Sequence, residues 1–331
     1  MLTTPPSQLR LAIDGGKSKT HAAIVDEHGR ELSRSTGPGL AIIETPGGVE
    51  AVTASLRETL AGLGGGEAFH TVCIGLNGVL RAGASATALA LEAVRRVCES
   101  RRFIVTSDVV TSYVGAIGVT PGVVIAAGTG SVILALGDDG APHAVDGSGP
   151  LCGDRGSGYD IGRRGLDSAL RFADGLRGSE LIFAEVVKMF GGTPQAMNAI
   201  YTGSNPSRVI ASFSRGVAAA AALGDATALS VWEGAAADLA EGAVAAAAAA
   251  SLLDTPFTVA TAGGLFDVGA VLWEPLAREL SQRAPHASLR PGLGGALSGA
   301  VKLALSPEPI LTGVSTWVDT ETSGRREHAG G

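Results

Sequence analysis

The sequence predicts an α/β protein built from two similar halves, and three observations support this. Short β-branched runs alternate with longer amphipathic segments, which is typical of mixed α/β folds. A strand that ends in a glycine turn and continues as a second strand occurs near residue 9 and again near residue 123. The length of 331 residues is enough for two domains of roughly 150 residues each.

Composition and charge narrow the range of functions. A chain with 45% hydrophobic and 17% charged residues is globular. The net charge of −7, without a basic cluster, argues against a nucleic-acid partner. Acidic residues interrupt the alanine-rich stretch 217–253, which argues against a membrane span. The first residues lack the pattern of a signal peptide and the three cysteines form no paired motif, so we expect a cytoplasmic protein.

The first half is predicted to begin with three strands. The first, 9–13, runs into Asp14-Gly15-Gly16, and the second, 21–25, leads through a glycine turn into a short third strand. Apolar spacing then predicts helices and further strands in alternation. These are a helix over 47–63, a strand over 71–74, a helix over 85–95 and a strand over 103–105.

The second half repeats this opening. A strand over 123–127 runs into Gly128-Thr129-Gly130-Ser131, and a second strand, 132–136, is followed by the hairpin signal Asp138-Asp139-Gly140. The rest is more helical, with predicted helices at 166–173, 179–190, 206–222 and 226–253, and a strand at 257–260 before Gly263-Gly264. No Pro- or Ser-rich linker separates the halves, so we expect them to pack closely around a cleft.

The two glycine turns are candidate phosphate loops. A turn without Cβ atoms presents backbone N–H groups and lets an anion approach closely. One such turn alone is usually only a turn, but here two follow buried strands with Ser or Thr beside them. A P-loop is excluded because Leu11 stands where that motif needs glycine, and no GxGxxG opens a helix after the first strand.

Two aspartates lie at predicted strand ends. Asp14 directly precedes the first glycine turn, where a carboxylate can hold Mg²⁺ beside phosphate oxygens. Asp108 follows the strand 103–105, at the edge where α/β folds keep their ligands. Asp108 is equally well interpreted as the N-cap of the next helix, and one residue can serve both purposes.

Three motifs together resemble the N-acetylglucosamine kinase family, within the wider group of BadF/BcrA-type ATPases and the actin–hexokinase–heat-shock-chaperone superfold. They are Asp14-Gly15-Gly16-Lys17-Ser18-Lys19-Thr20, Ala127-Gly128-Thr129-Gly130-Ser131 and Gly153-Asp154-Arg155-Gly156-Ser157-Gly158-Tyr159. The resemblance covers about residues 9–305 and implies two ribonuclease-H-like domains with an ATP cleft between them. The domains implied are 1–117, joined by a returning helix within 292–305, and 118–291, with 306–331 expected to be a flexible tail anchored at most at Trp317.

The resemblance also assigns roles to residues. Gly15 to Thr20 and Gly128 to Ser131 correspond to the phosphate loops, and Gly263 with Gly264 to the adenosine-side glycine pair. Asp14 is the expected Mg²⁺ ligand and Asp108 the catalytic base. The expected sugar contacts are Asn77, Asp108, Gly153, Asp154 and Arg155. The implied reaction transfers the γ-phosphate of ATP to a hydroxyl, the 6-OH, of an amino sugar such as N-acetylglucosamine or glucosamine.

The sequence departs from the family pattern near the expected sugar site. Arg155 replaces a glutamate, Asp160 stands where an aromatic residue is common, and the segment 37–43 lacks the usual asparagine. Replacing an acceptor by Arg155 inverts the preferred charge of the ligand, so the substrate can be acidic or otherwise different. Lys17 replaces a third glycine, and we expect it to point to solvent.

Two other functions remain open at this stage. One is a BadF-type ATPase activator of a partner enzyme, although Cys73, Cys98 and Cys152 are too few and misplaced for its iron–sulfur cluster. The other is a non-catalytic sugar or nucleotide sensor. We expect Cys73 in the core. Cys152, beside the third motif, could line the pocket, but we expect it to be a small buried filler. The expected partner is a small-molecule sugar, with no nucleic acid and no membrane, and homodimers are common among similar kinases.

Overall fold

The computed structural model describes residues 8–64, 68–203 and 205–320. The chain divides into two compact units. The first unit holds the described residues up to Val119 together with those from Leu293 onward, and the second runs from Thr120 to Gly292.

The first unit is built on a six-stranded sheet of order β11-β5-β4-β1-β2-β3. Strands β1, β2 and β3 form an antiparallel meander, β4 and β5 continue parallel to β1, and β11 closes the edge antiparallel to β5. The strands are β1 (Arg10–Gly15), β2 (Lys19–Val25), β3 (Glu31–Pro38), β4 (Ala68–Leu76), β5 (Glu99–Ser107) and β11 (Ser315–Asp319).

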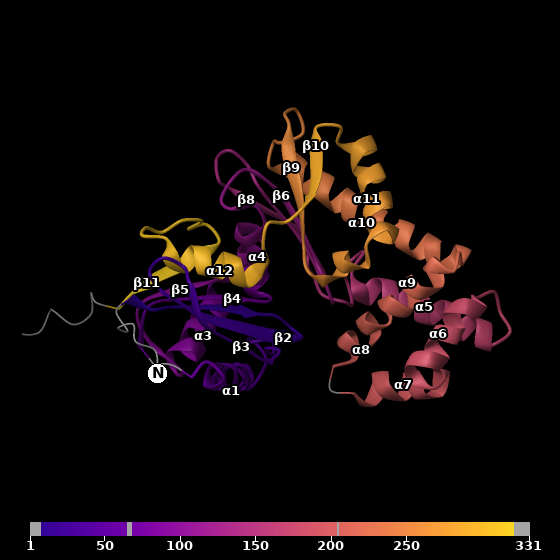
Figure 1. The fold of residues 1–331 in the computed structure, drawn as a ribbon, viewed down its shortest axis with the longest axis horizontal. Helices are drawn as coiled ribbons and strands as arrows, with labels where there is room; N and C mark the ends of the chain where they lie inside the picture. The colour runs from indigo at the N-terminus through magenta and orange to yellow at the C-terminus, as the bar shows by residue number, and fades with distance from the viewer. Residues whose placement is uncertain (1–7, 65–67, 204, 321–331) are drawn as a thin grey trace, which may run out of the picture. The chain divides into compact units, whose positions relative to one another are not determined.

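Helices cover both faces of this sheet, as Figure 1 shows. The helices are α1 (Gly48–Ala61), α2 (Val79–Ala82), α3 (Ala84–Arg95), α4 (Asp108–Ile117) and α12 (Ala296–Leu305). Side chains alternate along β1, so that Leu11 and Ile13 join the core formed with α1 and α3, whereas Ala12 joins the one formed with α4 and α12. Gly299 brings α12 against α4, because a Cβ there would overlap the carbonyl oxygen of Thr111. This close packing fixes the helix that begins at Asp108.

The second unit has a five-stranded sheet of order β10-β9-β6-β7-β8. Its first three strands again form an antiparallel meander, and β9 and β10 continue parallel to β6. The strands are β6 (Gly122–Ala127), β7 (Ser131–Leu136), β8 (Pro142–Asp146), β9 (Phe257–Ala262) and β10 (Ala287–Pro291). This order matches β5-β4-β1-β2-β3 strand for strand, which confirms the predicted α/β class and the internal duplication.

The helices of the second unit are α5 (Gly158–Ala173), α6 (Glu180–Phe190), α7 (Thr193–Thr202), α8 (Pro206–Ser212), α9 (Ser214–Ala222), α10 (Ala226–Ala249), the 3₁₀ helix η2 (Gly264–Val268) and α11 (Ala270–Arg283). The alanine-rich α10 packs across β6, β7 and β8 and buries its own Trp232 and Leu239 in the core. Its small side chains allow this close approach to the sheet. No helix in the described part of the chain is long and apolar enough to cross a membrane.

Several elements differ from the sequence-based expectation. The range 306–331 was expected to be a flexible tail, but Ser315–Asp319 form β11, and Trp317 Nε1 donates to the Ile310 carbonyl oxygen at 3.2 Å. Residues 321–331 of that range lie outside the described residues. Helix α7 and strand β10 were missed.

Helix α5 starts at Gly158 rather than near 166. Its glycines weaken the helical pattern, although Gly162 and Gly165 are required where α8 and α9 pack closely against it.

Candidate functional site

The two predicted carboxylates lie at the carboxyl edge of the first unit's sheet. Asp14 is near the end of β1, and Asp108 is the first residue of α4, directly after β5. β4 lies between β1 and β5, and Asn77 follows it with its backbone N–H donating to the Gly15 carbonyl oxygen at 3.1 Å. The sheet thus gathers Asp14, Asn77 and Asp108 at one edge, as expected for parallel strands.

Burial perturbs the pKa of both carboxylates, and repulsion from Asp108 adds to the effect at Asp14. Burial, helped by the charge of Asp108, raises the pKa of Asp14 to about 7. Burial also raises the pKa of Asp108, although hydrogen bonds from the Ser107 hydroxyl and the Val109 N–H, and the charge of Lys17, act in the opposite direction. Such perturbed pairs are typical of sites that bind cations or move protons.

Asp108 is not the N-cap of α4. Ser107 occupies that position, and its hydroxyl donates to Asp108 Oδ1 at 3.0 Å. The same Asp108 oxygen accepts from the Val109 N–H at 2.9 Å. These two donors fix the carboxylate's orientation.

Asn77 contributes a buried amide. The residue is 6% exposed, and its Nδ2 has no hydrogen-bond partner among the described residues. A buried donor left without an acceptor costs about 1–3 kcal/mol, so a ligand oxygen here would relieve that cost. The expected sugar contact at Asn77 is consistent with this, and its role stays a prediction.

The first glycine turn connects β1 and β2. The Gly16 N–H donates to the Lys19 carbonyl oxygen at 3.1 Å, which closes the turn. Lys17 is exposed, as expected, yet its charge still acts on Asp108. Thr20 is fully buried, and its hydroxyl donates to the Pro38 carbonyl oxygen at 2.7 Å. Its side chain therefore supports the turn, and its role in phosphate binding stays a prediction.

The carboxylates of the first unit fit a magnesium ion in their donor chemistry. Mg²⁺ is usually held by one or two carboxylates together with waters and substrate phosphates. No group of three or more His, Cys, Asp or Glu side chains that could hold a metal occurs among the described residues. Asp14, with Asp108 beside it, would match this requirement, and its role as an Mg²⁺ ligand stays a prediction.

The second unit brings three predicted motifs together. The turn Gly128–Ser131 contacts the segment 153–159, hereafter the sugar loop, through the Gly158 N–H to the Gly128 oxygen at 2.9 Å. The Ser131 hydroxyl donates to the Arg155 carbonyl oxygen at 2.7 Å. Gly263 follows β9 next to β6, where a Cβ would overlap the Ala127 carbonyl oxygen.

The carboxylate of Asp154 packs on the second glycine turn. A Cβ at Gly130 would lie 2.6 Å from Asp154 Oδ2, so a side chain there would displace this carboxylate. Asp154 is 3% exposed and has a positive φ of 55°, a conformation uncommon for a residue with a side chain. Strained residues of this kind concentrate at functional sites.

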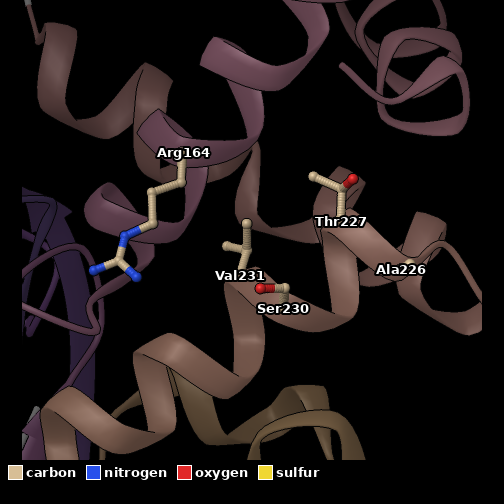
Figure 2. A pocket seen from close by; sticks show the side chains of 5 residues that line it. All are labelled: Arg164, Ala226, Thr227, Ser230 and Val231. Atoms are coloured by element: carbon tan, nitrogen blue, oxygen red, sulfur yellow. The ribbon is translucent and has the colours of Figure 1, made fainter. Parts of the chain in front are cut away.

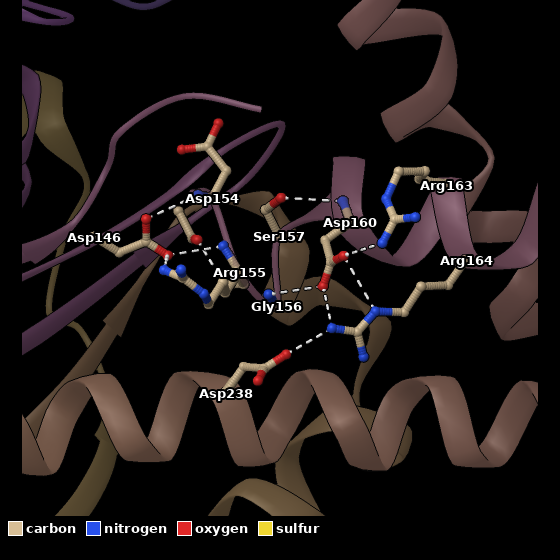
Figure 3. A network of polar contacts seen from close by, with 10 residues as sticks. Asp146, Asp154, Arg155, Gly156, Ser157, Asp160, Arg163, Arg164 and Asp238 are labelled. Carbon is tan, nitrogen blue, oxygen red and sulfur yellow. Dashed lines mark hydrogen bonds and ion pairs between the residues drawn. The ribbon is translucent and has the colours of Figure 1, made fainter. Parts of the chain in front are cut away.

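Two further carboxylates hold the sugar loop in place, as Figure 3 shows. Asp146, at the end of β8, accepts the backbone N–H groups of Asp154 at 2.9 Å and Arg155 at 2.8 Å. Asp160 accepts the Gly156 N–H at 3.2 Å and pairs with Arg164, whose Nη2 lies 2.7 Å from Asp160 Oδ2.

Arg164 extends this network to another helix. Its Nη2 also lies 2.7 Å from Asp238 Oδ2 on α10, so the sugar loop is tied to both α5 and α10.

Sequence reasoning missed Asp146, Arg164 and Asp238. The only local signal was polar residues at a strand end and within helices, which is also the pattern of a solvated surface. Cys152 was expected to be buried and is exposed.

The comparisons with known proteins agree with this geometry. The chain is 28% identical to the N-acetylmuramic acid/N-acetylglucosamine kinase of Clostridium acetobutylicum, over 89% of this chain and 98% of that protein. It is 31% identical to the N-acetyl-D-glucosamine kinase of Dictyostelium discoideum, over 50% of this chain and 56% of that protein.

A solved structure shares the fold. The crystal structure of a candidate N-acetylglucosamine kinase of Chromobacterium violaceum superposes with a TM-score of 0.70 at 27% identity, covering 91% of this chain and 100% of that one. This confirms the fold class of two ribonuclease-H-like domains. The model of the BadF/BadG/BcrA/BcrD ATPase family matches residues 11–299. The chain therefore belongs to the BadF/BadG/BcrA/BcrD ATPase family, as the three glycine-containing motifs indicated.

Proposed function

We propose that this protein is an ATP-dependent sugar kinase that transfers the γ-phosphate of ATP to the 6-hydroxyl of an amino sugar such as N-acetylglucosamine or glucosamine. The names of the relatives support the reaction class and the sugar. The observation that carries the proposal is the edge of the first unit's sheet, where Asp108 lies beside Asp14 and the unpartnered amide of Asn77.

Asp108 is the proposed general base. Its raised pKa makes the carboxylate a better proton acceptor than an ordinary aspartate, while Ser107 and Val109 fix its orientation. It would accept the proton of the attacking sugar hydroxyl. The Asn77 amide would donate to a second oxygen of the same substrate and hold it in place.

The glycine turns are the proposed phosphate contacts. Phosphoryl transfer depends mainly on positioning and on neutralising charge at the phosphate oxygens. The turns Gly15–Thr20 and Gly128–Ser131 would supply backbone N–H groups other than those of Gly16 and Gly128, which donate within the turns themselves, and Lys17 would add positive charge. Mg²⁺, when bound with the nucleotide, supplies charge neutralisation at the phosphates, and Asp14 is the side chain that would hold it.

The cysteines favour the kinase over an iron–sulfur activator. Burial raises the pKa of the Cys73 thiol and that of the Cys98 thiol, the latter to about 12. Iron is bound by thiolates, which these two buried side chains do not readily form. Cys73 is fully buried in the core, as predicted.

The first test measures ADP release from Mg-ATP with N-acetylglucosamine, glucosamine and glucose. We expect turnover with an amino sugar, and the Asp108→Asn variant should lose about 10²–10⁴-fold in kcat because the base is missing. The substitution keeps the size of the side chain, so nucleotide binding should persist.

The control is Asp319→Asn, which removes a carboxylate far along the chain in β11, and it should leave kcat unchanged. ATP binding without turnover on any sugar would contradict the kinase proposal. An Asp108→Asn variant with normal kcat would contradict the assignment of the base.

A further inference from the structure

A pocket beside the sugar loop has two arginine side chains in its lining. Its volume is about 400 Å³, within the range of small-molecule sites, and it lies wholly within the second unit. The lining that matters for binding is Leu151, Cys152, Arg155, Tyr159, Asp160 and Arg163. Arg155 is also the residue that replaces the family's glutamate.

Most of the guanidinium donors of these arginines are available to a ligand. The Arg155 side chain is 63% exposed, and its nearest acid is Asp146, with Nη1 to Oδ2 at 3.7 Å, beyond hydrogen-bond distance. The Arg163 side chain is 56% exposed and makes one contact among the described residues, from Nη2 to Asp160 Oδ1 at 3.3 Å. Each guanidinium carries five N–H donors in a planar fork suited to an oxyanion.

The nearby carboxylates lie behind these arginines. The side chains of Asp146 and Asp160 are 7% and 10% exposed. Asp146 is occupied by the backbone N–H groups of residues 154 and 155, and Asp160 by Gly156 and Arg164. The formal charges of these aspartates and arginines nearly cancel. The carboxylate oxygens, however, are buried and already hydrogen-bonded, whereas the guanidinium donors are exposed.

A second pocket differs from the first because its arginine is already paired with carboxylates. It measures about 390 Å³ and is lined by Arg164 with small residues at the start of α10, as Figure 2 shows. Its one guanidinium is already bound to Asp160 and Asp238. An anion there would have to displace two carboxylates, so that pocket offers no comparable site.

We propose that the pocket beside the sugar loop binds an oxyanion carried by the sugar substrate, with Arg155 and Arg163 as the residues that select it. The oxyanion is a carboxylate or a phosphate on a substituent of the ring. The exposed Leu151 and the ring of Tyr159 give the pocket an apolar wall for the body of that substituent. The inference rests on the proposed function, because Asp154, next to Arg155, is the expected sugar contact.

The test uses three ligands that share one sugar ring. They are neutral N-acetylglucosamine, N-acetylmuramic acid, which adds a carboxylate on an ether, and N-acetylglucosamine 1-phosphate. Calorimetric titration of the full chain measures the Kd of each at low and high salt, and ADP release measures kcat/KM for those with a free 6-hydroxyl. The variants are Arg155→Gln and Arg163→Gln, with Arg177→Gln, beyond the far end of α5, as the matched control.

We expect at least one anionic sugar to bind more tightly than the neutral one. Arg155→Gln and Arg163→Gln should each weaken that binding by about tenfold or more, because a charge-assisted hydrogen bond is lost. Both variants should weaken binding of the neutral sugar by clearly less than they weaken binding of the anionic sugar, and Arg177→Gln should match the wild type. High salt should reduce the preference, and the better anionic ligand identifies the group as carboxylate or phosphate.

Other results separate the two proposals. If the neutral sugar is phosphorylated and neither anionic sugar binds, the pocket inference fails and the kinase proposal stands. If both variants weaken all three sugars equally, the arginines only support the loop and the inference fails. If an anionic sugar binds through both arginines and no sugar is phosphorylated, the inference stands and the kinase proposal fails.

Discussion

At the scale of single residues, the site combines groups that are costly to bury. Asp14 and Asp108 are partly buried carboxylates with raised pKa values, and Asn77 has an amide donor without a partner among the described residues. Natural proteins keep such groups mainly where a ligand compensates for them. The residues proposed to carry the reaction therefore also lower the stability of the protein without a ligand.

This trade-off predicts a stabilising substitution, Asp14→Asn. The folded-state pKa of Asp14 is about 7 against 3.8 for an unperturbed aspartate, so the folded protein binds its proton more tightly than the unfolded chain does. Stability is therefore lost as the pH rises from about 4 to about 7. Removing the charge should raise the free energy of unfolding above pH 7 by up to about 4 kcal/mol, since the pKa rises from 3.8 to about 7 and each pKa unit corresponds to about 1.4 kcal/mol.

Urea unfolding at several pH values, without nucleotide or Mg²⁺, measures this difference. The gap between variant and wild type should widen between about pH 4 and pH 7 and then level off. A gap that does not depend on pH would contradict the burial of a charged Asp14. The same variant should lose most of the stabilisation that Mg-ATP gives the wild type.

At the scale of elements, the sugar loop depends on helices on both sides of it. Asp160 on α5 holds the Gly156 N–H, and Arg164 joins Asp160 to Asp238 on α10. Ser157 also caps α5 by accepting the Asp160 N–H at 3.3 Å. The loop is thus fixed by the same contacts that start the helix.

The substitution Arg164→Met tests this coupling. It leaves Asp160 and Asp238 without their shared cation, and we expect a loss of about 1–3 kcal/mol in the free energy of unfolding. We also expect a higher KM for the sugar with a smaller change in the KM for ATP, because the loop is loosened. Unfolding and steady-state kinetics measure both effects.

Arg278→Met is the matched control. Arg278 forms an exposed pair with Glu233 at 3.8 Å, and such surface pairs contribute about 0–1 kcal/mol. Equal destabilisation of the two variants, or an unchanged sugar KM in Arg164→Met, would argue against the coupling between α10 and the loop.

At the scale of the whole molecule, the two units contain two copies of the same sheet order. The predicted site residues follow strand ends in both units. In the first unit, a segment far along the chain completes the sheet, since β11 pairs with β5. Arg102 on β5 binds Asp319, with Nε to Oδ1 at 2.7 Å, and lies 5.7 Å above the Trp317 ring. Without β11, β5 would be an open edge, and open edges promote aggregation.

Trp317→Ala tests whether β11 contributes to stability. We expect the free energy of unfolding to fall by about 1–3 kcal/mol, because the ring loses its packing, its hydrogen bond and its contact with Arg102. Thr316→Ala, at the exposed neighbouring position, should cost less than about 1 kcal/mol as the control. Thermal unfolding of both variants is the measurement, and equal small losses would mean that β11 is not an important part of the first unit.

A homodimer stays a prediction, which light scattering would test.

Local sequence patterns were sufficient to predict the fold class, the duplication and the family of this protein. β-branched runs and the repeated strand–glycine turn–strand pattern were enough for the α/β class and the duplication, because strand formation and tight turns depend on neighbouring residues. The positions of Asp14 and Asp108 at strand ends followed from the same reading. The three glycine-containing motifs were enough for the family.

Only the tertiary structure decided which residues meet. Asp146, Arg164 and Asp238 lie on three different elements, and no local pattern shows that they hold the sugar loop. Cys152 was expected to be buried and is exposed, because burial depends on what packs over a residue. Strand β11 is polar and short on its own, and it becomes a strand because β5 offers an unpaired edge in space, far away in sequence.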